Sequence, residues 1–220
     1  MIRAILGDKR EWIRQLSLDP VTGLDPKGIK VRVAQGLEAA DRFVTGYWIW
    51  DKVINNLAAI GYDSSRLLLA SYDWRLAYSN LELRDAYYTR LKAHIELSFK
   101  IHKMKTVLVS HSMGGPVTFY FLKWVEAQNG GQGGSDWVEM YIDSWVNAAG
   151  PMLGVTKAMA AEFSGEMRDS AELPASAAAV LEKLFSRHER SQMFRTWAGA
   201  SGMFIKGGDD VWGNLTHAVS

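Results

Sequence analysis

The sequence predicts an α/β fold in which a parallel sheet is covered by helices on both faces. Two observations lead to this prediction. Short apolar runs typical of buried strands alternate along the chain with longer runs whose apolar residues recur at helical spacing, and parallel neighbours in a sheet need helical crossovers of that kind. From Thr156 onward the runs are helical only. We therefore expect a sheet-containing core over residues 1–155 and the start of a helical cap over residues 156–220.

The elements expected before the sheet are a loop and a helix. Residues 17–36 hold three glycines and two prolines, and they repeat the unit Leu-Asp-Pro at Leu18–Pro20 and Leu24–Pro26, which is typical of tight turns. The helix that follows has one apolar stripe: Trp50, Val53, Ile54, Leu57 and Ile60. Gly61 comes next, at the position where a left-handed helix cap is expected.

Strands and helices are then expected to alternate. Arg66–Ser71 is predicted to form a short buried strand. Ser79 and Glu82 have the spacing of a capping box, and they predict one long amphipathic helix that continues to Phe99. Thr106–Val109 follows as the second apolar strand.

The next crossover begins after Ser112. Pro116 is tolerated in the first turn of its helix, because the amides there have no intrahelical partners. Gln128–Ser135 carries four glycines and is predicted to be a flexible loop; no strand leads directly into it, so it lacks the context of a phosphate-binding loop. Tyr141–Ala149 is the third predicted strand. Two helices are expected in the cap: Ala158–Phe163 and Ala177–Phe185.

The composition argues against several kinds of function. Lys and Arg number 25 against 24 Asp and Glu, so the formal charge of +1 provides no field for nucleic acid, and no such partner is expected. The absence of cysteine removes disulfides and thiolate metal sites. No apolar run approaches the roughly 18 residues of a membrane span, and the charged N-terminus lacks the apolar stretch of a signal peptide. Most of the nine tryptophans are expected in the core.

One motif carries chemistry. Ser110–Gly114, with the sequence Ser-His-Ser-Met-Gly, lies between an apolar strand and an amphipathic helix, which is the context of a nucleophile elbow. Such a turn presents a serine hydroxyl to a base and to amide donors for an oxyanion, and it needs small residues two positions to either side. The sequence therefore predicts part of an α/β-hydrolase fold with Ser112 as the nucleophile, at positive φ. The alternative is a buried serine in an ordinary strand-to-helix turn, with Ser110 where the motif usually has glycine.

The other members of a catalytic triad are harder to assign. His111 is excluded as the base, because neighbouring residues that leave a strand point to opposite sides. On this fold the acid and then the histidine follow the serine along the chain. His188 lies in a charged run and His217 lies three residues from Ser220, so both are expected at the surface. The candidate acids are Asp136, Asp143, Asp169, Asp209 and Asp210.

The oxyanion hole also lacks a component. The backbone amide of Met113 is expected to be its first donor, since it follows the nucleophile. The second donor normally comes from a loop after an earlier strand, and residues 1–30 contain no such strand and loop. The residues therefore predict a nucleophile whose full catalytic apparatus is not contained in this chain.

Several motifs, taken in order, resemble the phospholipid:diacylglycerol acyltransferases, a family related to lecithin:cholesterol acyltransferase, and the fungal members look most similar. The likeness covers nearly the whole chain, and it is far more specific than the elbow alone. The segments that carry it are Leu18–Pro26, Gly46–Trp50, Tyr72–Arg75, His111–Gly114, Lys123–Glu126, Asn147–Gly150 and Phe185–Arg187.

The resemblance implies a particular reaction. The serine would attack the sn-2 ester of a phospholipid, form an acyl-enzyme, and pass the acyl group to diacylglycerol, giving triacylglycerol and lysophospholipid; no metal or soluble cofactor is implied. It also implies attachment to a membrane, with the catalytic domain in the lumen of the endoplasmic reticulum. Asn214–Thr216 is a glycosylation sequon compatible with that location.

Carried over to this sequence, Ser112 matches the family nucleophile and Met113 the oxyanion amide. The Asp and Arg of Tyr72–Arg75 match a motif expected to hold local structure together. The family's anchor, oxyanion loop, catalytic Asp and catalytic His match nothing in this chain, which indicates an internal fragment, a truncated gene model or a degenerate copy. Three functions stay open: an acyltransferase, a lipase or phospholipase, and a non-catalytic remnant that binds lipid or a partner.

Overall fold

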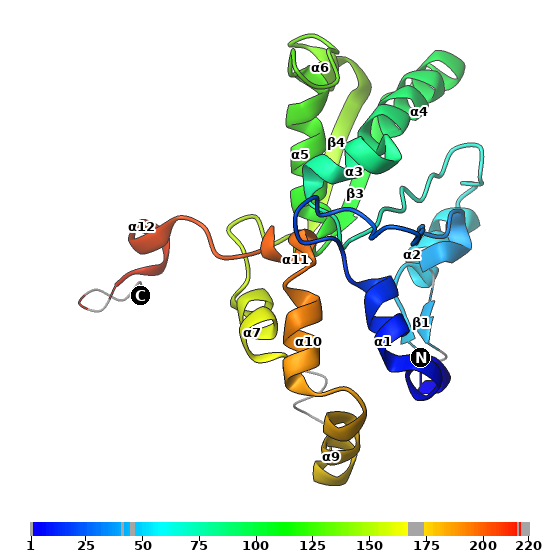
Figure 1. The fold of residues 1–220 in the computed structure, drawn as a ribbon. Coiled ribbons are helices and arrows are strands. Elements are labelled where there is room, and N and C mark those ends of the chain that lie inside the picture. Colours follow the sequence, from blue (N-terminus) through cyan, green and yellow to red (C-terminus); the bar gives the residue numbers. More distant parts are fainter. Residues whose placement is uncertain (1, 41, 45–46, 167–173, 215, 217–220) are drawn as a thin grey trace.

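A computed structural model describes residues 2–40, 42–44, 47–166, 174–214 and 216. Helix α1 (Ile2–Leu16) leads through an irregular segment to the short helix η1 (Leu37–Ala40) and to two short antiparallel strands, β1 (Arg42–Val44) and β2 (Tyr47–Trp48). The irregular segment contains the loop predicted at residues 17–36. Its first turn is fixed by Asp19, whose carboxylate accepts the amides of Val21 and Thr22 at 3.1 and 2.8 Å. Figure 1 shows α1 and β1 at the lower right, near the end marked N.

Helix α2 (Asp51–Ala59) forms as predicted, and Gly61 has the expected left-handed φ of +97°. Of the predicted apolar stripe, Trp50, Val53, Ile54 and Leu57 line a common cavity, whereas Ile60 is exposed. The prediction of one helix from Ser79 was wrong, because two form: α3 (Tyr78–Asp85) and α4 (Tyr87–His102), separated by Ala86 at φ +47°. The capping box predicted for Ser79 and Glu82 does not form. The Glu82 carboxylate accepts the amides of Tyr88 and Thr89, so it caps the second helix instead of the first.

The principal sheet consists of two parallel strands, β3 (Thr106–His111) and β4 (Ile142–Ala148). They are joined by α5 (Gly114–Glu126) and α6 (Trp137–Tyr141), and Ser110 lies opposite Asn147 in their register. Both predicted strands are thus confirmed with small changes in length. The parallel pair with its helices agrees with a partial α/β-hydrolase fold.

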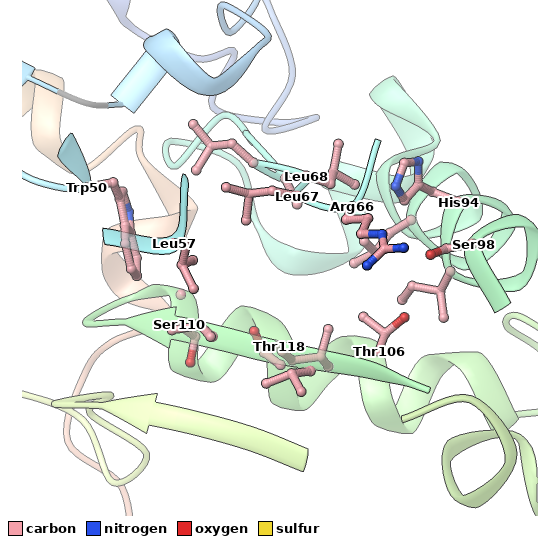
Figure 2. A pocket seen from close by; sticks show the side chains of 18 of the residues that line it. Trp50, Leu57, Arg66, Leu67, Leu68, His94, Ser98, Thr106, Ser110 and Thr118 are labelled. Atoms are coloured by element: carbon pink, nitrogen blue, oxygen red, sulfur yellow. The ribbon is translucent and has the colours of Figure 1, made fainter. Parts of the chain in front are cut away.

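The strand predicted at Arg66–Ser71 does not form. The segment runs in the same direction as β3. At its start, the carbonyl of Ser65 lies 3.3 Å from His102 Nε2, shortly before β3 begins. After its end, Gly199 lies close to both the carbonyl of Trp74 and the side chain of Met113, which follows β3. Between the segment and β3 lies a cavity of about 490 Å³, lined by leucines of one and valines of the other (Figure 2). An extended segment becomes a strand only through ladder hydrogen bonds, and the cavity prevents them.

The core lies between α4, α5 and α6. Its largest fully buried side chains include Tyr88, Phe121 and Trp137, and the ring of Phe121 meets Trp137 edge-on with centroids 5.7 Å apart. The indole nitrogen of Trp137 donates to Glu96 at 2.8 Å, so this tryptophan is buried without losing its polar partner. The core thus fixes α5, which packs against β3.

The described residues after β4 form helices only: α7 (Thr156–Ser164), α9 (Ala175–Leu184), α10 (Arg187–Phe194), α11 (Ala198–Ser201) and α12 (Gly208–Trp212). Figure 1 shows α7, α9 and α10 grouped below the sheet. Ser191 Oγ donates to the carbonyl of Glu162 at 2.6 Å, and Trp197 Nε1 donates to the carbonyl of Leu16 at 2.8 Å. The helical part therefore packs on the N-terminal segment as well as on itself. Within the described ranges, no helix is both long and apolar enough to cross a membrane.

Candidate active site

Ser112 occupies a sharp turn between β3, which ends at His111, and α5, which begins at Gly114. Its φ is +51°, so the predicted conformation is confirmed. The Ser112 amide donates to the carbonyl of Ala148 at 3.0 Å, and its own carbonyl accepts the amide of Gly115 at 2.9 Å. The side chain is exposed. A serine held in this strained backbone conformation, with an accessible hydroxyl, is what the elbow of a nucleophilic hydrolase requires.

Met113 lies at the N-terminus of α5. Its side chain is buried, with 9% exposed, and a Cβ built on Gly199 of α11 would lie 2.9 Å from Met113 Cε. Among the described residues, no acceptor takes the Met113 amide hydrogen. A free amide beside the nucleophile, at the positive end of a helix dipole, can stabilise an oxyanion. The catalytic roles of Ser112 and Met113 nevertheless stay predictions.

The glycines after Met113 differ in what they permit. A Cβ at Gly114 would lie 3.5 Å from the Cβ of Ser110, an ordinary contact. A Cβ at Gly115 would lie 2.7 Å from Asn147 Oδ1 and 2.8 Å from the Cα of Gly150. Of these two glycines, Gly115 is therefore the one that the packing requires. The motif pattern alone draws attention to Gly114.

None of the histidines in the described ranges forms a hydrogen bond with Ser112. The ring of His111 instead meets that of Trp50 edge-on, with centroids 6.4 Å apart, as expected for a structural role. His188 is exposed and is the second residue of α10, whose other end leads towards α11. His217 lies outside the described residues. Within the part of the chain that the structure describes, no histidine is therefore hydrogen-bonded to the serine as a base would be.

The described candidate acids lie on elements away from the Ser112 turn. Asp136 precedes α6, and Asp143 is the second residue of β4, whereas Ser112 lies beside the end of that strand. Asp209 and Asp210 are exposed in the first turn of α12, and Asp169 lies outside the described residues. None of the described candidate acids forms a hydrogen bond with a histidine or with Ser112.

The charged pair of Tyr72–Arg75 has the structural role expected of it. Arg75 donates from Nε and Nη2 to Asp73 at 3.0 and 2.7 Å, and from Nη1 to the carbonyl of Leu16 at 3.0 Å. Arg84 Nη2 lies 3.0 Å from Asp73 and its Nη1 lies 3.1 Å from Asp25. Burial raises the pKa of the Asp73 carboxyl, but hydrogen bonds and charge from Arg75, aided by Arg84, outweigh it and hold that pKa below its usual value. This buried ionic cluster joins the N-terminal loop to the Tyr72–Arg75 segment and to α3.

The parallel strand pair, its flanking helices and the left-handed serine turn define a partial α/β-hydrolase fold. The model of the lecithin:cholesterol acyltransferase family matches residues 1–220, and the chain belongs to that family. The resemblance inferred from the motifs is confirmed.

Among its relatives, the chain is 56% identical over 218 residues to a phospholipid:diacylglycerol acyltransferase of Schizosaccharomyces pombe, covering 99% of this chain and 34% of the relative. It is 49% identical to the protein of the same name from Saccharomyces cerevisiae, covering 98% of this chain and 33% of that one. A bovine lysosomal phospholipase A and acyltransferase is 28% identical, over 78% of this chain and 40% of that protein. The chain thus spans about a third of the length of the acyltransferases that it matches over almost its whole length.

Proposed function

We propose that this chain is the nucleophile-bearing part of an acyltransferase that moves a fatty acyl group from the sn-2 position of a phospholipid to diacylglycerol. One observation carries the proposal. A serine at φ +51° between a parallel strand and a helix lies in a chain that matches phospholipid:diacylglycerol acyltransferases over almost its whole length. The proposal places the reaction at a membrane surface, on the lumenal side of the endoplasmic reticulum.

The proposed chemistry has two halves. Ser112 Oγ attacks the ester carbonyl and gives its proton to a base, while the Met113 amide stabilises the oxyanion. The ester bond breaks, and lysophospholipid leaves with that proton, which yields an acyl-serine. The hydroxyl of diacylglycerol then attacks this ester, loses its proton to the same base, and releases triacylglycerol as Ser112 regains a proton. No metal or soluble cofactor takes part in this scheme.

The described residues supply only some of these groups. They provide the nucleophile and one oxyanion donor, whereas the described His and Asp side chains do not serve Ser112. The proposal therefore assigns the base, its acid and the second oxyanion donor to parts of the whole protein outside these residues. A non-catalytic remnant of the family would differ in having no such parts.

Hydrolysis is the second candidate. The bovine relative is named both a phospholipase A and an acyltransferase, and the two activities share the acyl-enzyme. They differ only in whether water or an alcohol attacks the acyl-serine. The product identifies the acceptor: triacylglycerol indicates transfer, and free fatty acid indicates hydrolysis.

A hybrid enzyme tests the proposal. In the S. pombe relative, the region that matches this chain is replaced by this chain, and transfer of a labelled sn-2 acyl group to diacylglycerol is measured. We expect triacylglycerol from the hybrid, none above the blank from its Ser112→Ala variant, and full activity from Ser135→Ala, which changes an exposed serine before α6. An active Ser112→Ala hybrid would contradict the proposed nucleophile, and an inactive unsubstituted hybrid would favour the remnant.

A further inference from the structure

We infer that Ser110 is a positioning residue for Ser112: its hydroxyl forms a hydrogen-bonded bridge to Trp145 and Asn147 of β4 that holds the nucleophile turn in place. The inference rests on the proposed function, because it takes Ser112 as the nucleophile. The bridge lies where the elbow motif usually has glycine, a residue that has no hydroxyl to offer.

The bridge is defined by two contacts. Ser110 is buried, with 5% exposed, and its Oγ accepts the indole hydrogen of Trp145 at 2.8 Å. An indole nitrogen only donates, so the hydroxyl hydrogen of Ser110 is directed elsewhere. Its acceptor is Asn147 Oδ1, at 3.4 Å. The hydroxyl therefore uses both its accepting and its donating capacity, and both partners belong to the strand beside β3.

Asn147 connects this bridge to the helix after the nucleophile. Its side chain lies between two glycines: a Cβ at Gly115 would lie 2.7 Å from Asn147 Oδ1, and a Cβ at Gly150 only 2.1 Å from the same atom. Asn147 can therefore occupy its place only because both positions lack a side chain. The bridge thus links the end of strand β3, before Ser112, to the first turn of α5, after it.

The backbone around the bridge is strained. Ser112 and Ala149 are both non-glycine residues in the left-handed region, with φ of +51° and +52°. They lie at the same end of the strand pair, where the Ser112 amide donates to the carbonyl of Ala148. Such conformations persist only where the surrounding structure fixes them. The side-chain bridge through Ser110 adds to the few backbone bonds that fix this turn.

Substitutions in the hybrid enzyme test the role of the hydroxyl. Ser110→Ala should lower kcat about tenfold, the equivalent of one lost hydrogen bond, and leave KM within about twofold, because the buried Ser110 hydroxyl faces Trp145 and Asn147 of β4. Trp145→Phe should do the same, and the double variant should be no worse than either single one, since both remove one bridge. Ser110→Thr, which keeps a hydroxyl, should regain activity. Ser144→Ala, an exposed hydroxyl on β4, is the matched control and should change nothing.

The rates are expressed per site titrated with a fluorophosphonate probe, so that loss of folded protein does not mimic loss of positioning. Hydrogen exchange of the Ser112 amide is measured in the same proteins and should be about tenfold faster in Ser110→Ala, whether or not the hybrid is active. Unchanged exchange, or a Ser110→Ala variant with full kcat per titrated site, would overturn the inference. An active Ser112→Ala variant would instead overturn the proposed function, so the two failures are distinct.

Discussion

The adjacent glycines after Met113 should respond in opposite ways to the same substitution. Gly115→Ala places a methyl group 2.7 Å from Asn147 Oδ1 and 2.8 Å from the Cα of Gly150, and both neighbours are fixed by the end of β4. Overpacking of this kind costs about 1–3 kcal/mol. Alanine in a helix recovers at most about 1 kcal/mol relative to glycine. Because both contacts are shorter than 3.0 Å, the cost should be about 2–3 kcal/mol, which leaves a net destabilisation of about 1–2 kcal/mol.

Gly114→Ala is the matched comparison. Its methyl group would lie 3.5 Å from the Cβ of Ser110, which is ordinary contact, so the helix propensity of alanine should leave stability unchanged or raise it by up to about 1 kcal/mol. Thermal unfolding of the two variants in the hybrid enzyme, followed by tryptophan fluorescence, measures the difference; about 2–4 °C corresponds to 1 kcal/mol in a domain of this size. Equal midpoints for both variants would show that the packing of Asn147 between Gly115 and Gly150 does not occur.

Three further predictions concern stability and activity. Asp73→Asn removes the buried carboxylate that Arg75 and Arg84 share most closely, leaves Asp25 as their remaining common partner, and should cost about 3 kcal/mol in a urea titration; a loss below 1 kcal/mol would contradict the role of the ionic cluster. Although burial raises the pKa of Asp73, the arginines keep that pKa below its value in the unfolded chain. The stability that the ionised Asp73 contributes should therefore be present at neutral pH and be lost as the pH falls through the folded-state pKa. Thermal midpoints measured from pH 7 to pH 3 should fall less in Asp73→Asn than in the unsubstituted protein. Residues 1–220 expressed alone should transfer acyl groups at the assay floor, roughly 10⁴-fold or more slower than an enzyme with a complete triad. The same protein should bind a hydrophobic dye through the apolar residues of β3. Turnover above a Ser112→Ala blank would reveal a base within the chain.

Local signals predicted the parts of this fold that local chemistry determines. The glycine after α2, the turns of residues 17–36 and the strand-to-helix turn at Ser112 all depend on residues close in sequence. The strand expected at Arg66–Ser71 failed because a strand needs a neighbour, and no pattern of leucines supplies one. The helix expected from Ser79 failed because Glu82 caps the following helix instead.

At the candidate site, too, the local features were predicted and the long-range contacts were not. The sharp turn at Ser112 follows from five adjacent residues, while the catalytic roles of Ser112 and Met113 stay predictions. The bridge through Ser110 was not predicted, because Trp145 and Asn147 lie more than thirty positions away and meet the serine only through the register of β3 and β4. A sequence signal does exist: Gly115 and Gly150 are small residues beyond the motif, and small residues near a turn indicate close approach of another chain segment. That signal identifies a crowded position without identifying its neighbour.

Direct detection of the acyl-enzyme tests the central claim. The hybrid enzyme is mixed with phospholipid labelled in its sn-2 acyl group, without diacylglycerol, and the quenched protein is digested with trypsin and examined by mass spectrometry. Cleavage after Lys105 and Lys123 releases one peptide that holds both Ser110 and Ser112. The account predicts the acyl group on Ser112, with fragment ions excluding Ser110, and its loss when diacylglycerol is added. Transfer to diacylglycerol with the label on another residue, or with no acylated peptide, would contradict it.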